Sequence, residues 1–112
     1  MSAKPVVALF EVEADLEFAK TYYSSWQTNG AERLLEKYDE TVGAIELTPD
    51  AYPRKHGAIQ RAILRRSFYL VYFIQESDRS VVLAVLDGRR SPREIRRLVG
   101  FRRLLPRPGT DE

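Results

Sequence analysis

Arginine is the most abundant side chain of this sequence that could do chemistry, and most of it lies in the second half of the chain. Fourteen of the eighteen Lys and Arg residues fall within residues 54–107, where only four carboxylates accompany them. That segment carries a charge of about +10, whereas residues 1–53, with four basic and ten acidic residues, carry about −6. A charge distribution this uneven indicates an anionic partner for the basic half, such as nucleic acid, a ribosome or an acidic protein surface.

Seven arginines are candidates for a target-binding surface. Two lie on one face of an expected strand, two follow the last strand, and three belong to the helix after it. They are Arg61 and Arg65, Arg89 and Arg90, and Arg93, Arg96 and Arg97. Their guanidinium groups can bind phosphate or carboxylate bidentately but do not act as bases at neutral pH. The first four come from neighbouring strands or strand ends, so they can converge. The alternative is that the arginines are solvated or paired with acidic helices of the same chain.

Other catalytic groups are scarce, so we predict no catalytic residue, no metal and no cofactor. His56 is the only histidine, it lies in a proline-rich segment, and the chain has no cysteine to partner it. No HExxH or Cys/His spacing indicates a metal site, and no glycine-rich loop indicates a bound phosphate. The carboxylates of residues 11–17 are best explained as a solvated helix face. The arginines could therefore bind an anion or stabilise developing charge, but no placed proton acceptor accompanies them.

The first half of the chain predicts one strand followed by two helices. Residues 6–10 are apolar without alternation, which favours a central strand. Residues 12–26 and 31–45 each carry apolar side chains at spacings of three and four, the pattern of an amphipathic helix. The break at Thr28-Asn29-Gly30 is so short that the two helices should form an antiparallel hairpin.

The second half predicts three strands and a helix. Residues 48–57 contain two prolines and a glycine and should be a loop. Strands are expected from residue 60, over 68–74 as a central strand, and over 81–86, joined by short antiparallel connections. Ser91-Pro92-Arg93-Glu94 forms a capping box that begins a helix, which should end at Gly100.

The predicted fold class is α+β: a helical hairpin packed on one face of a small, twisted, mainly antiparallel sheet, in the order β-α-α-β-β-β-α. Residues 1–100 should form one domain and residues 101–112 a mobile C-terminal tail. No apolar run is long enough for a membrane span, and the first residues lack a signal sequence. The expected location is therefore the cytoplasm, with no membrane partner.

Four stretches of the sequence resemble the RelE/ParE superfamily of type II toxin–antitoxin toxins. They are Val12-Glu13-Ala14-Asp15-Leu16, Pro49, residues 60–72 and residues 81–92. The resemblance covers roughly residues 6–95, and it lies in the ordered set of stretches rather than in a single motif. The family fold, a helical hairpin on a twisted antiparallel sheet, agrees with the element order predicted above.

The resemblance implies one of two toxic activities. RelE-like members are ribosome-dependent mRNA endoribonucleases, whereas ParE-like members inhibit DNA gyrase. Arg61 and Arg90 match basic positions of the nuclease pattern, but Ile63 and Leu70 occupy positions where it has basic residues, and Arg96 stands near its tyrosine. The chain is therefore more similar to the ParE-like toxins. The alternatives are a RelE-like endoribonuclease acting on ribosome-bound mRNA and a non-toxic binding module of the same fold.

The resemblance also implies a cognate antitoxin as partner, assembled with the toxin into a hetero-oligomer. In the family, a mainly helical antitoxin segment wraps the toxin. Candidate contacts on the helical hairpin are Leu16, Tyr23, Trp26, Leu34 and Tyr38. The alternative for each of these residues is packing in the interior of the toxin itself.

Overall fold

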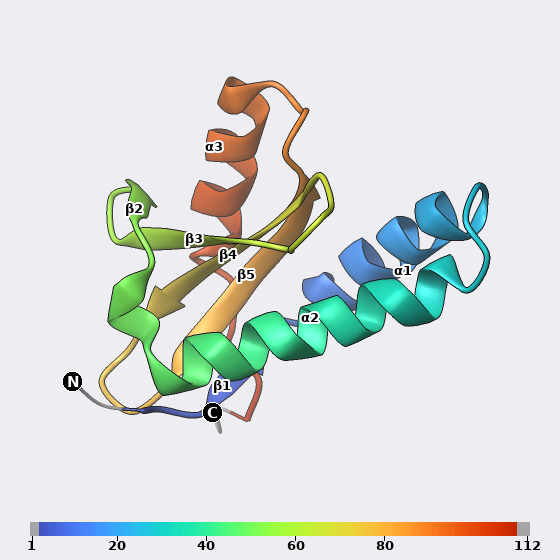
Figure 1. The fold of residues 1–112 in the computed structure, drawn as a ribbon. Helices are drawn as coiled ribbons and strands as arrows, with labels where there is room; N and C mark the ends of the chain where they lie inside the picture. Colours follow the sequence, from blue (N-terminus) through green and yellow to red (C-terminus); the bar gives the residue numbers. More distant parts are fainter. Residues whose placement is uncertain (1–2, 110–112) are drawn as a thin grey trace.

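The structure is a computed structural model that describes residues 3–109. Its elements are β1 (Val6–Ala8), α1 (Glu11–Ser24), α2 (Gly30–Leu47), the 3-10 turn η1 (Pro49–Ala51), β2 (Arg54–His56), β3 (Ile59–Ile63), β4 (Tyr69–Gln75), β5 (Ser80–Asp87) and α3 (Pro92–Arg102). The strands form one sheet in the order β1-β5-β4-β3-β2. The pairing of β1 with β5 is parallel and the other three pairings are antiparallel. The predicted α+β class is confirmed (Figure 1).

The predicted helical hairpin is present, and its connection depends on two residues. Asn29 adopts a left-handed conformation, with φ of 58°. This conformation is one that asparagine tolerates better than most residues. At Gly30 a Cβ atom would lie 2.3 Å from the carbonyl oxygen of Tyr23. Only glycine therefore allows the start of α2 to approach the end of α1 this closely.

The middle of the sheet agrees with the prediction, but its two edges do not. Strands β4 and β5 occupy central positions, and almost all of their residues are buried. Strand β1, predicted to be central, is an edge strand and ends at Ala8. The apolar run that favoured a central strand includes Leu9, a core residue beyond the strand, and Phe10, which is 81% exposed at the start of α1. The run thus continues beyond β1 to the residue that precedes α1.

The opposite edge contains a strand that the sequence analysis placed in a loop. Residues 54–56 pair with β3 across the turn at Gly57, whose φ is 61°. The buried side chain of Gln60 donates hydrogen bonds to the carbonyl oxygens of Pro49 and Tyr52 (2.8 and 2.9 Å). These bonds hold the proline-containing segment against the sheet, so that β2 can add to its edge.

The helices cover both faces of the sheet, whereas the prediction placed them on one. Successive residues of a strand point to opposite faces. In β4, Tyr69 packs against Tyr23 of α1, with ring centroids 5.9 Å apart. Leu70 and Tyr72 instead line a hollow together with Ile95 of α3. Helix α3 therefore lies across the sheet from the hairpin (Figure 1).

Helix α3 begins where predicted but ends later. The Ser91 Oγ accepts hydrogen bonds from the backbone N–H groups of Arg93 and Glu94, as the capping box requires. The helix continues through Gly100 and ends at Arg102. The predicted tail therefore begins too early. Residues 110–112 of that tail lie outside the described part of the chain.

Arg102 belongs to an ion pair that completes the open part of the β5 edge. Because β1 pairs only with residues 80–82, no strand within residues 3–109 covers the edge of β5 beyond Val82. There the Asp15 carboxylate accepts a hydrogen bond from the Val85 N–H (2.9 Å), and the Arg102 guanidinium donates to the Leu83 carbonyl oxygen (3.0 Å). The two side chains pair bidentately at 2.6 and 2.9 Å. Asp15, predicted to lie on a solvated helix face, has a side chain only 9% exposed.

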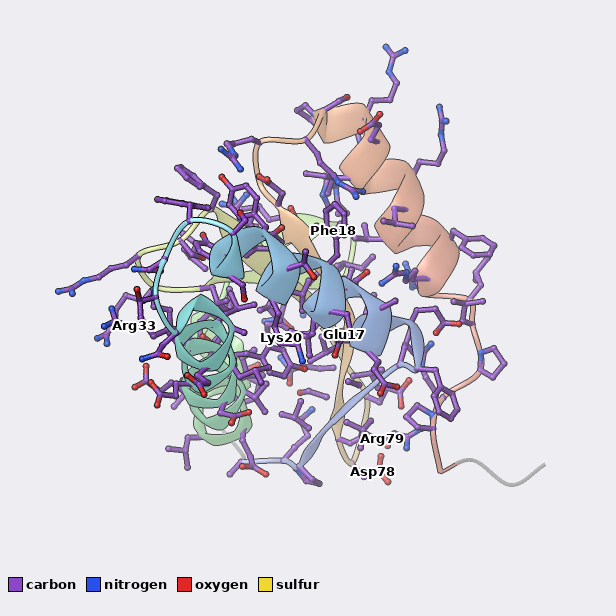
Figure 2. All side chains as sticks on the ribbon, turned by 90° about the vertical axis from the view of Figure 1, so that its right-hand side faces the viewer. Glu17, Phe18, Lys20, Arg33, Asp78 and Arg79 are labelled. Atoms are coloured by element: carbon purple, nitrogen blue, oxygen red, sulfur yellow. The ribbon has the colours of Figure 1, made fainter. Side chains whose placement is uncertain are left out.

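A second ionic cluster attaches the segment after α3 to the turn between β4 and β5. Glu76 accepts hydrogen bonds from the Arg79 Nε (3.0 Å) and the Arg107 Nε (2.9 Å). Burial alone would raise the pKa of Glu76, but the hydrogen bonds from Arg107 and Arg79 outweigh it, so the pKa is lowered. The turn containing Asp78 and Arg79 is labelled in Figure 2.

Acid should therefore weaken the fold through Glu76. A carboxyl group whose pKa is lower in the folded state binds fewer protons there, so its stabilisation is present above its unfolded pKa of about 4.3 and is lost as the pH falls through the folded pKa. We expect Glu76→Gln to reduce the pH dependence of the unfolding free energy between about pH 3 and 5. Urea unfolding at several pH values measures it. Asp78→Asn, in the same turn, is the control; equal slopes in both variants would contradict the assignment.

Candidate functional site

Several elements of the basic half surround a small hollow on the face of the sheet that carries α3. Its volume is about 180 Å³. It is lined by Lys55, His56, Arg61, Leu70, Tyr72, Gly88, Arg90, Pro92 and Ile95. The polar side chains come from β2, from β3 and β4, and from the turn between β5 and α3. Among residues 3–109 no acidic side chain lines this hollow, although Arg90 also lines neighbouring hollows with Glu94 and with Asp87.

Arg61 lines this hollow, and one of its donor nitrogens is not satisfied. Arg61 on β3 lies directly opposite Tyr72 on β4, so the two side chains lie side by side on the same face of the sheet. The Nε atom of Arg61 is buried and has no hydrogen-bond partner among the described residues. Burial raises the pKa of Tyr72, although the neighbouring Arg61 opposes that shift. A buried donor without a partner is costly, so this arrangement of Arg61 is held at some cost in stability.

His56 occupies the rim of the hollow, although the sequence analysis treated it as part of a loop. Its ring centroid lies 5.8 Å from that of Tyr72. Partial burial lowers the pKa of His56, and the positive charges of Arg96, Arg61 and Lys55 lower it further. The imidazole is therefore neutral at pH 7. One signal could have located it: glycine at position 57 is typical of a tight turn between paired strands, which would place His56 at a strand end.

Of the seven predicted target-binding arginines, the structure brings Arg61 and Arg90 into this hollow. Arg96 lies close enough to influence the pKa of His56, whereas Arg97 borders a larger open hollow of about 630 Å³ along α3, which Arg90 also lines. Arg93 is exposed on the first turn of α3. The arginines of α3 therefore extend the basic surface outward from the hollow.

Arg65 and Arg89 lie elsewhere, so the four arginines from the strands do not all converge. Arg65 follows β3 and lies 3.7 Å from a carboxylate oxygen of Glu40 on α2, and both side chains are exposed. Arg89 pairs with Asp87 at 2.7 Å, and its guanidinium carbon lies 4.1 Å from the ring centroid of Phe68. For Arg65 the structure shows the alternative of the sequence analysis, pairing with an acidic helix, whereas Arg89 pairs with a carboxylate at the end of β5.

The five candidate antitoxin contacts divide by burial. Tyr23 and Leu34 are core residues, 7% and 2% exposed, and offer a partner almost no surface. Trp26 is 61% exposed just after α1 and stacks on Tyr23. Leu16 and Tyr38 are partly buried and line an open, mainly apolar hollow of about 330 Å³ between the start of α1 and α2.

Phe10 is the residue of this hairpin surface that the sequence analysis missed. It lines the same hollow as Leu16 and Tyr38, and its ring is the most exposed part of it. Burial, followed by the charges of Asp39 and Asp15, raises the pKa of Tyr38 to about 12. The tyrosine is thus neutral at any physiological pH, and the hollow beside it is mainly apolar, although Glu13 also lines it.

Within residues 3–109, no cluster of three or more His, Cys, Asp or Glu side chains is arranged to hold a metal ion. In the same part of the chain, no helix has both the length and the apolar character needed to cross a bilayer.

A helical hairpin on a mixed five-stranded sheet, with a basic hollow beneath the last helix, defines a toxin fold of the RelE/ParE superfamily. The sequence profile described as "ParE toxin of type II toxin-antitoxin system, parDE" matches residues 10–92, so the chain belongs to the ParE family of type II toxin–antitoxin toxins.

One solved structure and the curated sequences complete the comparison. A chain of the "Chromosomal ParDE TA system from P. aeruginosa" superposes with a TM-score of 0.65 and 14% identity, over 74% of this chain and 94% of that one. At this identity the likeness shows a shared fold. No curated protein matches the sequence significantly.

Proposed function

We propose that this ParE-family toxin arrests growth by inhibiting DNA gyrase in the cytoplasm and that a cognate antitoxin neutralises it. The match of residues 10–92 to the ParE toxins carries the proposal. The site supports it, because a hollow lined by Lys55, Arg61 and Arg90 without a carboxylate is suited to binding an anionic surface.

The site also favours inhibition by binding over catalysis. A general base acts efficiently when a further group orients it, commonly a carboxylate or a carbonyl oxygen. His56 is mainly neutral at pH 7, but among the described residues no carboxylate lines its hollow to orient the ring. The purified toxin is therefore expected not to cleave mRNA on ribosomes.

A ribosome-dependent endoribonuclease remains the second candidate, and one observation favours it. The structure places His56 beside Arg61, Tyr72 and Arg90, which would supply a proton acceptor next to two cations. Cleavage of ribosome-bound mRNA that His56→Ala abolishes, while the variant unfolds at the same temperature, would reverse the order of the two candidates.

The antitoxin is proposed to cover the apolar hollow between α1 and α2. An exposed ring beside two partly buried apolar side chains, Leu16 and Tyr38, is the kind of surface that a helical segment fills. The interface should bury well over about 1,000 Å² if it is tight and specific. Trp26 at the far end of the hairpin would mark the limit of the covered surface.

Phe10→Ala is expected to weaken antitoxin binding by about 2 kcal/mol, roughly thirtyfold, as for an aromatic anchor at the centre of an interface. The ring is 81% exposed in the toxin alone, so its removal should leave the folded toxin intact. Calorimetric titration with the antitoxin measures the change. Phe101→Ala, which removes a ring 61% exposed on α3, is the matched control. Equal affinities for the two variants would move the interface away from this hollow.

Expression of the chain in a bacterial host, alone and together with its neighbouring open reading frame, tests the proposed function. Growth arrest that the second gene relieves is the expected result. Normal growth at a high level of the folded protein would instead favour a non-toxic binding module.

A further inference from the structure

We propose that the hollow between β2, β3 and the turn before α3 binds a phosphate group of the DNA backbone. The inference rests on the proposed function for its choice of DNA. It adds that this gyrase inhibitor holds the nucleic acid as well as the enzyme. Lys55, Arg61 and Arg90 would donate hydrogen bonds to the phosphate oxygens, and His56 would lie at the rim.

The first argument is the imbalance of charge and of hydrogen bonds within the hollow. Three cationic side chains line it and no acidic one does. By contrast, Arg65, Arg89 and Arg102 each have a carboxylate of the same chain within 4 Å. The buried Nε of Arg61 has no acceptor among the described residues. An anionic group in the hollow would supply the missing negative charge and would accept hydrogen bonds from the cationic side chains that line it.

The second argument is the size and shape of the hollow. At about 180 Å³ it is smaller than the roughly 300–1,000 Å³ of sites that enclose whole small molecules, so it suits a single compact group. Its donors come from three separate elements around the space. A tetrahedral phosphate presents oxygens in several directions, whereas a carboxylate presents two oxygens in one plane. Donors arranged around a centre therefore favour phosphate.

The third argument is the surface around the hollow. The exposed cations Arg93, Arg96 and Arg97 follow it along α3. A nucleic-acid backbone carries a charge at every phosphate, so neighbouring phosphates would meet these side chains while one phosphate occupies the hollow. A free phosphate or a nucleotide would leave them without a role.

His56 provides a direct readout, because it is the only histidine in the chain. Its imidazole C–H resonance in an NMR spectrum therefore reports this hollow alone. The charges that face it are Lys55 on β2, Arg61 on β3 and Arg90 and Arg96 near α3, with the Tyr72 ring on β4. A bound phosphate should raise the titration midpoint of His56 by roughly 1 pH unit, the lower end of the effect of an opposite charge 4–6 Å away.

The experiment titrates the toxin with inorganic phosphate while chloride holds the ionic strength constant. We expect a saturable shift of the His56 resonance that acetate does not reproduce. Arg90→Gln should weaken phosphate binding about tenfold, whereas Arg33→Gln, which removes the same charge from α2, should not. Lys55→Gln, at a second exposed position of the hollow, should weaken binding in the same direction. A shift that chloride or acetate reproduces, or one that Arg90→Gln leaves unchanged, would overturn the site.

Short oligonucleotides then identify the source of the phosphate. A DNA duplex should displace inorganic phosphate from the hollow more effectively than RNA of the same sequence or a free nucleotide. Displacement by RNA or by nucleotide alone would overturn the assignment to DNA. If gyrase is inhibited but phosphate does not bind, this inference fails and the proposed function stands. If phosphate and DNA bind but gyrase is unaffected, the proposed function fails instead.

Discussion

Asp15→Ala is expected to destabilise the folded protein by about 3 kcal/mol, because it removes one partner of a buried ion pair. The carboxylate accepts hydrogen bonds from the Arg102 guanidinium and from the Val85 N–H, and both side chains of the pair are largely buried. Without Asp15, the Arg102 charge and the Val85 donor would be left unpaired. Since small domains are stable by about 5–15 kcal/mol, this loss would be a large fraction of the total. Urea denaturation measures it.

Two variants separate the ion pair from other effects. Glu17→Ala removes a carboxylate from the same helix, but that side chain is 66% exposed in its pair with Lys20, so we expect a change within about 0.5 kcal/mol (Figure 2). Asp15→Ala combined with Arg102→Met should cost less than the two single changes together, because no unpaired charge remains. A loss no larger than that of Glu17→Ala would show that Asp15 does not brace the edge of β5.

Arg90→Glu is expected to abolish growth inhibition while leaving the protein folded. Arg90 is exposed and lines both the small basic hollow and the larger hollow along α3, so a reversed charge there would repel an anionic target at the centre of the basic surface. The expected loss of target affinity is about 2 kcal/mol, roughly thirtyfold. Viability of cells after induction measures the loss of growth inhibition. The melting temperature of the purified variant shows whether the protein remains folded.

Arg33→Glu provides the matched control, because it makes the same change of charge on α2, away from the hollow (Figure 2). That variant should remain toxic. A folded Arg90→Glu protein that is fully toxic would remove this surface from the mechanism. A lower melting temperature for Arg90→Glu alone would indicate instead that Arg90 supports the fold.

The sequence was sufficient for the elements whose signal is local. The serine N-cap at Ser91, the two amphipathic helices and the buried strands β4 and β5 are each encoded within a few turns or residues, and all are present. The incorrect predictions concern which strands pair with each other and which face of the sheet a helix covers. Whether β1 lies at an edge, whether β2 pairs with β3, and which face α3 covers depend on contacts between distant segments, such as those of Gln60 with Pro49 and Tyr52.

In the candidate site, too, local sequence patterns predicted some features, whereas others depend on contacts between distant residues. Composition identified the arginines, and the sheet pattern predicted that those near strand ends could meet, which Arg61 and Arg90 do. Arg65 and Arg89 have partners from α2 and from Asp87 that no local pattern predicts. His56 was assigned to a loop because β2 is only three residues long and is rich in basic residues, which gives no apolar signal for a strand.

Plasmid supercoiling by purified gyrase, in the presence of the purified toxin, tests the central claim most directly. The proposed function predicts that an excess of toxin blocks the conversion of relaxed to supercoiled plasmid, that preincubation with the antitoxin restores it, and that Arg90→Glu has little effect on it. Normal supercoiling at the same excess of folded toxin, together with cleavage of mRNA on ribosomes, would contradict the claim.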